Sequence, residues 1–342
     1  MLGHVAGGSA DRFAGIAAFL AGAPTFGVHV FFAISGFVVP WSLFVQRYEL
    51  SDFPRYLARR LVRLDPPYIA AVALGAALVF VRSRRSGVPF PFTGVDLALH
   101  LGYLSGLARH QWVLPVFWTL GIEFQFYVLA GLLFPAIMSA ESWWVSRSVR
   151  QAAPDGRVVV RPSLRGLGEF VIVFVFAQAI VLLLNRFFNA QYLWSYYWLY
   201  FFVGLLLFLV RAKGLHWVAV VALFVVVRGI DGPSSDWAAL FGVALLVMMA
   251  PPTLPWLRTT IVGRCLNGLG HISYSLYLVH LLTVGSITQW ASRRWGVFSA
   301  PIAVGVFASE VALCLVLATA FYFVLEAPAI RLSRRIVIRG RA

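Results

Sequence analysis

The stretch FGVHVFFAISGF, residues 26–37, is almost wholly apolar, yet a histidine lies near its start and a Ser-Gly pair interrupts its middle. An α-helix needs about 20 apolar residues to cross a bilayer, and this run continues far enough to supply them. Polar residues at membrane depth are costly unless they have a partner or face a cavity. We therefore expect His29 at the membrane boundary, and Ser35 and Gly36 at a close contact between helices.

Apolar runs of this kind recur along the chain, in which 61% of the 342 residues are hydrophobic. A soluble domain of this length would need more charge to cover its surface. We expect nine spans, at residues 26–46, 66–82, 114–138, 167–185, 193–211, 215–229, 236–251, 271–291 and 299–325. The sequence predicts an all-α, polytopic transmembrane helical bundle.

The net charge of +15 reflects topology, not binding to nucleic acid. If the nine spans alternate, 19 of the 28 basic residues fall on one side of the membrane. Positively charged loops stay in the cytosol. We therefore expect the 47–65 and 139–166 loops and the basic tail at 331–342 to be cytosolic, in a protein of the plasma membrane (the inner membrane of a bacterium).

Three further stretches place polar residues in or beside predicted spans. In RYLARRLVRLDPPY, residues 55–68, arginines recur every four positions on one predicted helix face, and Pro66 and Pro67 are expected to reset the backbone at the entry to the next span. In FWTLGIEFQFYVL, residues 117–129, Glu123 and Tyr127 share a face at a spacing of four. In GLGHISYSLYLVH, residues 268–280, one face carries Ser273, Tyr277 and His280.

Together and in this order, the four stretches resemble the acyltransferase-3 family of integral membrane O-acyltransferases. Members of that family look like GVxLFFVLSGFL, then RRxxRIxPxY, then WSLxxExQFY, then GxxSYSLYLxH, and FVLEAPAIR around Glu326 is similar to the family's last helix. The resemblance implies a single domain, here residues 1–342, with about ten spans and a helical core at 26–330. It also implies transfer of an acyl group, often acetyl, from cytosolic acyl-CoA to a hydroxyl of an envelope or exported glycan or glycolipid.

The start of the chain is expected to hold an incomplete first span. In the family this span carries a basic residue and, about eleven positions later, a histidine thought to be catalytic. One alignment makes His4 that histidine, with residues 1–25 as the remnant of the span and an external loop. The other makes Arg12 the basic residue and places Ala23 at the histidine position. We favour His4, because alanine has no titratable group.

Acyl transfer to a hydroxyl needs a base or a nucleophile, and histidine has a pKa suited to that task. The predicted catalytic residues are His4, His29 and Glu123. A carboxylate beside aromatic residues, as in FWTLGIEFQFY, must be paired or protonated. Glu123 is expected to orient a histidine or to assist the acceptor, and an interhelical hydrogen bond that only fixes the bundle is the structural alternative.

Coenzyme A carries a pyrophosphate and a 3′-phosphate, which guanidinium groups bind in a bidentate manner. Arg59, Arg60 and Arg63 are the predicted phosphate-binding residues, with Tyr68 at the same entrance. Anchoring to anionic lipid headgroups is the alternative for the arginines. For the pantetheine arm and the thioester, the predicted lining residues are Ser273, Tyr277 and His280, which otherwise join helices by hydrogen bonds.

Two other functions fit the composition. A transporter or flippase for a lipid-linked sugar is possible, although neither inverted repeats nor paired broken helices are visible. A truncated, non-catalytic relative is the other. Cys265 and Cys314 are too few and too far apart for a metal cluster, so no metal is expected. The partners expected are a glycan or lipid-linked sugar and membrane lipids, while the acceptor's identity and the acyl chain length stay open.

Overall fold

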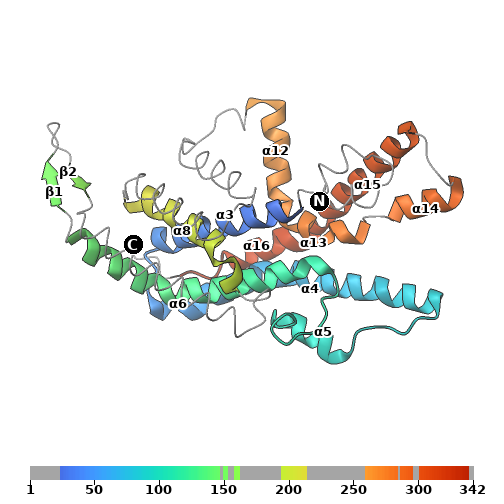
Figure 1. The fold of residues 1–342 in the computed structure, drawn as a ribbon, viewed down its shortest axis with the longest axis horizontal. Coiled ribbons are helices and arrows are strands. Elements are labelled where there is room, and N and C mark those ends of the chain that lie inside the picture. The colour runs from blue at the N-terminus through green and yellow to red at the C-terminus, as the bar shows by residue number, and fades with distance from the viewer. Residues whose placement is uncertain are drawn as a thin grey trace. The chain divides into compact units, whose positions relative to one another are not determined.

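The computed structural model describes residues 24–146, 149–152, 158–161, 194–213, 259–283, 286–295 and 300–338 (Figure 1). These residues are helical apart from connecting segments and one two-stranded hairpin. Within this part of the chain, four helical segments are long and apolar enough to cross a membrane: Gly27–Val45, Leu50–Ser86, Pro115–Pro135 and Pro301–Ser333. The prediction of an all-helical protein with apolar spans is confirmed to that extent.

The longer elements follow one another with short connections. The α-helices are α3 (Pro24–Val45), α4 (Phe53–Ser86), α5 (Gly94–Leu101), α6 (Trp118–Ser146), α8 (Trp194–Lys213), α12 (Ile261–His271), α13 (Ser273–Thr283), α14 (Ser286–Trp295), α15 (Ala300–Phe321) and α16 (Ala327–Ser333). Short 3-10 turns cover Leu50–Asp52 and Pro115–Phe117, and a π-helical turn, Tyr322–Glu326, joins α15 to α16. The hairpin pairs β1 (Val149–Ala152) with β2 (Val158–Arg161) in antiparallel register.

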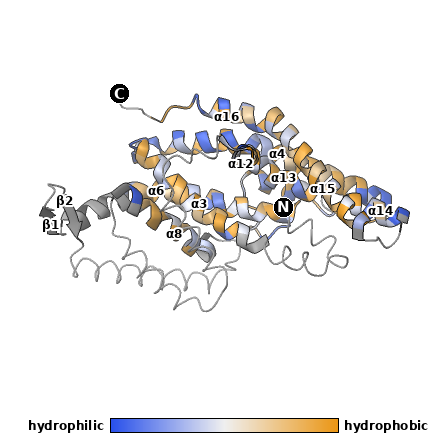
Figure 2. Cartoon of the chain, turned by 90° about the horizontal axis from the view of Figure 1, so that it is seen from above, coloured by the Kyte–Doolittle hydropathy of each residue, from blue (hydrophilic) through white to orange (hydrophobic). Residues whose placement is uncertain are grey.

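Several predicted spans coincide with observed helices. The spans 26–46 and 193–211 match α3 and α8, and 114–138 matches α6, which continues to Ser146. The span 299–325 matches α15 and its π-helical turn. Figure 2 shows the apolar character of α3 and α15 and the more hydrophilic character of α14. The predicted spans 167–185, 215–229 and 236–251 lie outside the described residues.

The prediction that Pro66 and Pro67 separate a cytosolic helix from the next span is wrong. Helix α4 runs without interruption through both prolines over 34 residues. Each proline removes one helical N–H donor, so carbonyl groups in the preceding turn lose their usual partner. The hydroxyl of Tyr274 donates to the neighbouring carbonyl of Leu64 at 3.0 Å, which shows that α13 supplies polar contacts to this part of α4.

The prediction of one span over residues 271–291 is also wrong, because two shorter helices cover it. Helix α13 ends at Thr283 and α14 begins at Ser286. A first-turn N–H of a helix has no partner within the helix. The backbone N–H of Thr288 instead donates to the side chain of Glu310 on α15 at 2.9 Å. This carboxylate stabilises the start of a separate helix, a contact that hydropathy cannot reveal.

The chain divides into two compact units. Unit 1 comprises residues 1–28, 58–121 and 251–336, and unit 2 comprises residues 29–57, 122–250 and 337–342. In unit 1, α13 packs closely on α15, and Leu278, Val279, Cys314 and Ala318 are fully buried. The prediction of a single domain over 1–342 stays a prediction.

In unit 2, two glycines bring the backbones of α3 and α8 together. A Cβ atom at Gly36 would lie 2.0 Å from the carbonyl oxygen of Phe201, and one at Gly204 would lie 2.0 Å from that of Ala33. Aromatic rings fill the space beside this crossing, where Phe201 stacks on Phe126 with ring centroids 4.2 Å apart. Small residues at the contact allow the helices to approach, as the sequence predicted for Gly36.

Replacing Gly36 by alanine should therefore destabilise unit 2. The added methyl group collides with backbone, which cannot move without separating α3 from α8, and such overpacking costs about 1–3 kcal/mol. Thermal unfolding of the reconstituted protein should show a clear fall in midpoint for Gly36→Ala. The matched control on the same helix is Gly27→Ala, because nothing lies within 4 Å of a Cβ atom at Gly27. Equal midpoints for the two variants would contradict the close contact.

Candidate active site

The carboxylate of Glu123 lies inside unit 2, where α6 faces α3. Its side chain is only 5% exposed. The Oγ–H of Ser35 on α3 donates to Glu123 Oε1 at 3.1 Å, and the hydroxyl of Tyr127, one turn further along α6, donates to the same oxygen. Ser35 thus has a polar role in addition to its small size. A hydrogen bond to a charged group contributes about 1.5–3 kcal/mol, so this contact stabilises the pairing of α3 with α6.

Helix geometry explains why these groups meet. Residues four apart lie on one face of a helix, which brings the ring of Tyr127 over Glu123 as the sequence predicted. Neighbouring tyrosines also hold this part of α6: the hydroxyl of Tyr56 donates to the carbonyl of Tyr127 at 3.2 Å, and that of Tyr48 donates to the carbonyl of Gly131 at 2.8 Å. The Glu123 carboxylate is therefore fixed on a rigid segment, as a group that handles a proton must be.

His29 lies on α3, six residues before Ser35, which corresponds to about 9 Å along the helix axis. Its imidazole stacks flat on the ring of Tyr200 in α8, with centroids 4.0 Å apart and an interplanar angle of 4°. This contact orients the histidine toward the aromatic residues of α8. His4, the third predicted catalytic residue, lies outside the described residues.

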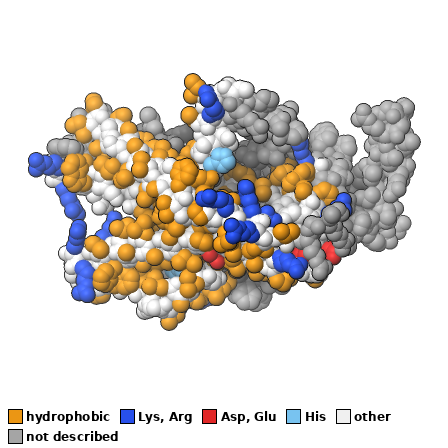
Figure 3. Space-filling view, turned by 180° about the vertical axis from the view of Figure 1, so that it is seen from behind, with side chains coloured by type: hydrophobic (Ala, Val, Ile, Leu, Met, Phe, Trp, Pro, Cys, Tyr) orange, Lys and Arg blue, Asp and Glu red, His pale blue; other side chains and the backbone are white. Residues whose placement is uncertain are grey.

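The predicted phosphate-binding arginines lie on α4 in unit 1. Arg63 is exposed, and Arg59 and Arg60 are half-buried. Arg59 is within electrostatic range of Arg60, Arg63 and Arg334. Arg334 follows α16, so a second element adds a guanidinium group that the sequence analysis assigned only to the basic tail. In the space-filling view, Lys and Arg side chains gather amid an apolar surface (Figure 3).

Tyr68, predicted at the entrance beside the arginines, is instead fully buried. Its ring stacks on Tyr103 at 4.7 Å and meets the edge of Phe117 at 5.2 Å. Tyr103 is a non-glycine residue with φ of +59°, and its hydroxyl donates to Asp65 at 2.7 Å. Burial raises the pKa of Tyr103 well above its usual range, so this hydroxyl stays protonated and donates. The hydroxyl of Tyr68 has no hydrogen-bond partner.

The three polar residues predicted on one face of 271–291 have different surroundings. Ser273 is exposed, and its hydroxyl donates to the carbonyl of Gly270 at 2.8 Å. Tyr277 donates to the carbonyl of Val116 at 2.6 Å and also contacts the hydroxyl of Thr119. His280 is buried, with Nδ1 2.8 Å from the carbonyl oxygen of Tyr277. The structure therefore brings Tyr277 and His280 together and leaves Ser273 at the start of α13.

Sequence reasoning missed a contact between Ser275 and Glu326. The backbone N–H and the hydroxyl of Ser275 both donate to Glu326 Oε2, at 3.1 and 2.6 Å. Arg63 is also within electrostatic range of this carboxylate. Ser275 lies in the quoted GLGHISYSLYLVH stretch and Glu326 in FVLEAPAIR, so both residues lie in stretches that carry the resemblance.

The contacts thus join the quoted sequence stretches in pairs: Ser35 to Glu123, Tyr277 to the start of the third stretch, and Ser275 to Glu326. A family model described as an acyltransferase domain matches residues 1–321. The chain belongs to the acyltransferase-3 family. Comparison with curated proteins gives no match, and comparison with solved structures gives none either.

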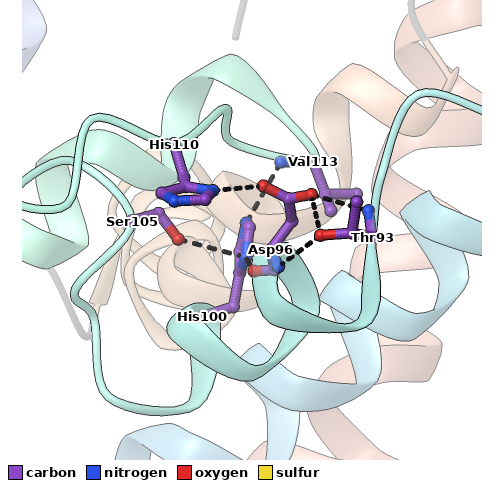
Figure 4. Close-up of polar contacts among 6 residues, drawn as sticks. All are labelled: Thr93, Asp96, His100, Ser105, His110 and Val113. Carbon is purple, nitrogen blue, oxygen red and sulfur yellow. Dashed lines mark hydrogen bonds and ion pairs between the residues drawn. The ribbon is translucent and has the colours of Figure 1, made fainter.

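The acyltransferase also contains a polar cluster between α4 and α6 that the sequence analysis did not predict (Figure 4). Thr93 and Asp96 form a reciprocal cap at the start of α5, in which the N–H and hydroxyl of Thr93 donate to Asp96 Oδ2 at 2.6 and 2.5 Å. His110 Nδ1 lies 2.6 Å from Asp96 Oδ1. The hydroxyl of Thr93, its backbone N–H and His110 together hold the pKa of Asp96 well below its usual range. The spacing T-x-x-D was the available sequence signal.

His100 is the buried centre of this cluster. Its Nε2 accepts from the backbone N–H of Val113 at 3.1 Å, which requires the hydrogen on Nδ1, and Nδ1 lies 2.7 Å from the carbonyl oxygen of Asp96. The neutral imidazole therefore ties α5 to the segment that leads into α6. Burial lowers the pKa of His100 below its usual range.

Within the part of the chain described, no group of three or more His, Cys, Asp or Glu residues gathers as metal ligands would. The acyltransferase chemistry available to these residues is hydrogen bonding, proton transfer and binding of anions.

The histidine link should respond to acid. The pKa of His100 is lower in the folded protein than in the unfolded chain, so the unfolded chain binds more protons and stability falls as pH drops below about 6.5. Hydrogen-exchange protection at Val113, corrected for intrinsic rate, should be higher at pH 7.5 than at pH 5.5. The difference should vanish in His100→Asn and persist in His271→Asn, which changes an exposed histidine. Protection that is independent of pH in the unsubstituted protein would contradict the link.

Proposed function

We propose that this protein is a membrane O-acyltransferase that moves an acyl group, acetyl in the first instance, from acyl-CoA to a hydroxyl of an envelope or exported glycan or glycolipid. Membership of the acyltransferase-3 family supports the reaction class. The observation that carries the proposal is the arrangement at Glu123, a buried carboxylate that accepts hydrogen bonds from Ser35 and Tyr127. An acceptor hydroxyl is a donor of the same kind, and a carboxylate in that position can take its proton.

The proposal includes a topology. A single domain over residues 1–342 would cross the inner membrane about ten times, with the basic tail in the cytosol. The excess of arginine on one side of the alternating spans supports this orientation. Acyl-CoA would then bind from the cytosol.

The transfer requires one bond to form and one to break. The acceptor oxygen attacks the thioester carbonyl, the new C–O bond forms, the C–S bond breaks, and coenzyme A leaves as the thiol after it receives a proton. His4 is the proposed base for the acceptor hydroxyl, and Glu123 is the proposed partner that orients the base or takes the proton itself. His29, held flat on Tyr200, is proposed to position the acceptor. Aromatic faces and imidazole edges are suited to a sugar ring and its hydroxyl groups.

The phosphates of coenzyme A are proposed to bind Arg59, Arg60 and Arg63. Their proximity to one another and to Arg334 supports this assignment, since four like charges close together favour an anion with several phosphates. Tyr68, Ser273, Tyr277 and His280 are proposed to line the path of the pantetheine arm. Tyr277 and His280 carry most of this role, because the hydroxyl of Ser273 is engaged with Gly270.

Glu123→Gln should reduce acyl transfer sharply while the protein stays folded. Glutamine keeps the shape and can still accept from Ser35, but it cannot hold a proton as a carboxylate does. General acid–base groups contribute roughly 100- to 10,000-fold, so a loss of that order is expected in kcat. The measurement is transfer of labelled acetyl from acetyl-CoA into alkali-labile ester in membrane vesicles, with His4→Ala expected to lose activity similarly.

The matched control is Glu49→Gln, the same chemical change at an exposed glutamate. Its activity should equal that of the unsubstituted protein. Full activity of Glu123→Gln would contradict the proposed role of the carboxylate. Movement of a lipid-linked sugar without any consumption of acetyl-CoA would show a transporter instead.

The arginine assignment predicts a specific loss of affinity for the donor. Arg59→Gln and Arg63→Gln should raise KM for acetyl-CoA roughly 10- to 100-fold, because a hydrogen bond between charged groups contributes about 1.5–3 kcal/mol. Acetyl-dephospho-CoA tests which phosphate is bound: if an arginine contacts the 3′-phosphate, its substitution should cost little more with this donor. Arg84→Gln is the control, since Arg84 lies over the ring of Phe80 on the same helix. An unchanged KM in both variants would assign these arginines to lipid headgroups.

A further inference from the structure

The connection between α4 and α6 has an unusual distribution of polar and apolar side chains. Residues 87–108 read GVPFPFTGVDLALHLGYLSGLA. Their exposed large side chains are aliphatic: Val88, Val95, Leu101, Leu104 and Leu107 are 44–62% exposed. The other exposed residues of this segment are glycine, proline and alanine, together with Thr93. Its surface therefore offers almost nothing for water to hydrogen-bond.

The polar side chains of the same segment point inward. Asp96, His100 and Ser105 are buried and bonded to one another, to Thr93 or to the backbone of Val113 (Figure 4). A loop in water has the reverse arrangement, with polar groups outside. Polar groups that satisfy one another internally, beneath an apolar exterior, are what hydrocarbon requires of irregular backbone.

Charged residues lie just beyond both ends of this segment. Arg82, Arg84 and Arg85 precede it and are exposed, and Arg109, His110 and Gln111 follow it and are also exposed. Long basic side chains at the ends of an apolar segment commonly reach the headgroup region while their neighbours stay in lipid.

The segment also returns along α4, which is one of the helices apolar enough to span a membrane. Phe90 packs on Phe80 at 5.7 Å, and Val113 lies against Gly75. The ribbon shows the chain turning back beside α4 after its end (Figure 1). On α4 itself Leu78, Phe80 and Val81 are exposed, so the apolar surface of the segment continues onto that of the helix.

We propose that residues 87–108 are immersed in the membrane, with lipid acyl chains covering their apolar face. Bilayer lipid is the occupant because the apolar surface is continuous with that of a candidate span and ends at arginines on both sides. The sequence analysis placed this connection in the aqueous phase outside the membrane, so the inference revises that topology. It is independent of the proposed acyl transfer.

Spin labels in the full-length, reconstituted protein test the proposal. Cys265 is exposed and is replaced by alanine, whereas Cys314 is buried and can stay. Single cysteines are introduced as Val95→Cys, Leu101→Cys and Leu104→Cys, with Ala98→Cys as a variant of almost unchanged size at another exposed site. The lipid reference is Val316→Cys on α15, which is 67% exposed. The aqueous references are Ser86→Cys and Arg109→Cys.

Collision rates of each label with oxygen, which concentrates in lipid, and with a water-soluble nickel chelate give the result. At positions 95, 98, 101 and 104 the oxygen rate should exceed the nickel rate, as at 316, and the order should reverse at 86 and 109. Nickel rates at 98, 101 and 104 as high as those at 86 would place the segment in water. Exclusion of both reagents there would show a protein cover. Either result would overturn the proposal, and neither depends on catalytic activity.

Discussion

Carboxylates buried among apolar helices must have hydrogen-bond donors, and this requirement organises much of the described structure. Hydrocarbon offers no donors, so each buried acid must be supplied from a neighbouring element. Glu123 is supplied by Ser35, Glu326 by Ser275, Asp96 by Thr93 and Glu310 by the N–H of Thr288. These contacts fix which helices pair. They also leave a carboxylate fixed within the bundle, where it can act on a hydroxyl group.

The same requirement explains the small residues beside the polar ones. The bond from Ser35 to Glu123 joins α3 to α6, and on the next residue Gly36 allows α3 to meet the backbone of α8. One helix therefore makes a polar contact and a close steric contact at neighbouring positions. The Ser-Gly pair in the opening stretch is needed for packing as much as for chemistry, and His29 belongs to the same helix at its aromatic end.

Hydropathy and residue spacing predicted α3, α6, α8 and α15, because a long apolar run in this composition has few alternatives to a helix. They failed where the outcome depends on a distant partner. Prolines normally end a helix, yet α4 continues through Pro66 and Pro67, with Tyr274 bonded to a carbonyl in the preceding turn. The predicted span over 271–291 divides where Glu310 caps α14. Neither partner is close in sequence to the element that it changes.

The candidate site was predictable to a similar degree. Glu123 with Tyr127 followed from helical spacing, and Gly36 at a close contact followed from residue size. Ser273 was placed on the wrong partner because α13 begins there and its hydroxyl bonds back to Gly270, and Ser275 was missed because its acid lies 51 residues away. Tyr68 was expected at an entrance but is buried under Tyr103. The cluster around His100 depends on a chain reversal that no periodicity describes.

The stoichiometry of the reaction is the most direct test of the central claim, that a carboxylate within this bundle serves transfer of an acyl group to a hydroxyl. Vesicles containing the protein would be given labelled acetyl-CoA, and free coenzyme A thiol and alkali-labile acetyl ester would be measured together over time. The account predicts one ester for each thiol released, at a rate far above that of vesicles without the protein. Release of thiol without ester, or the absence of both products in vesicles that contain the folded protein, would contradict it.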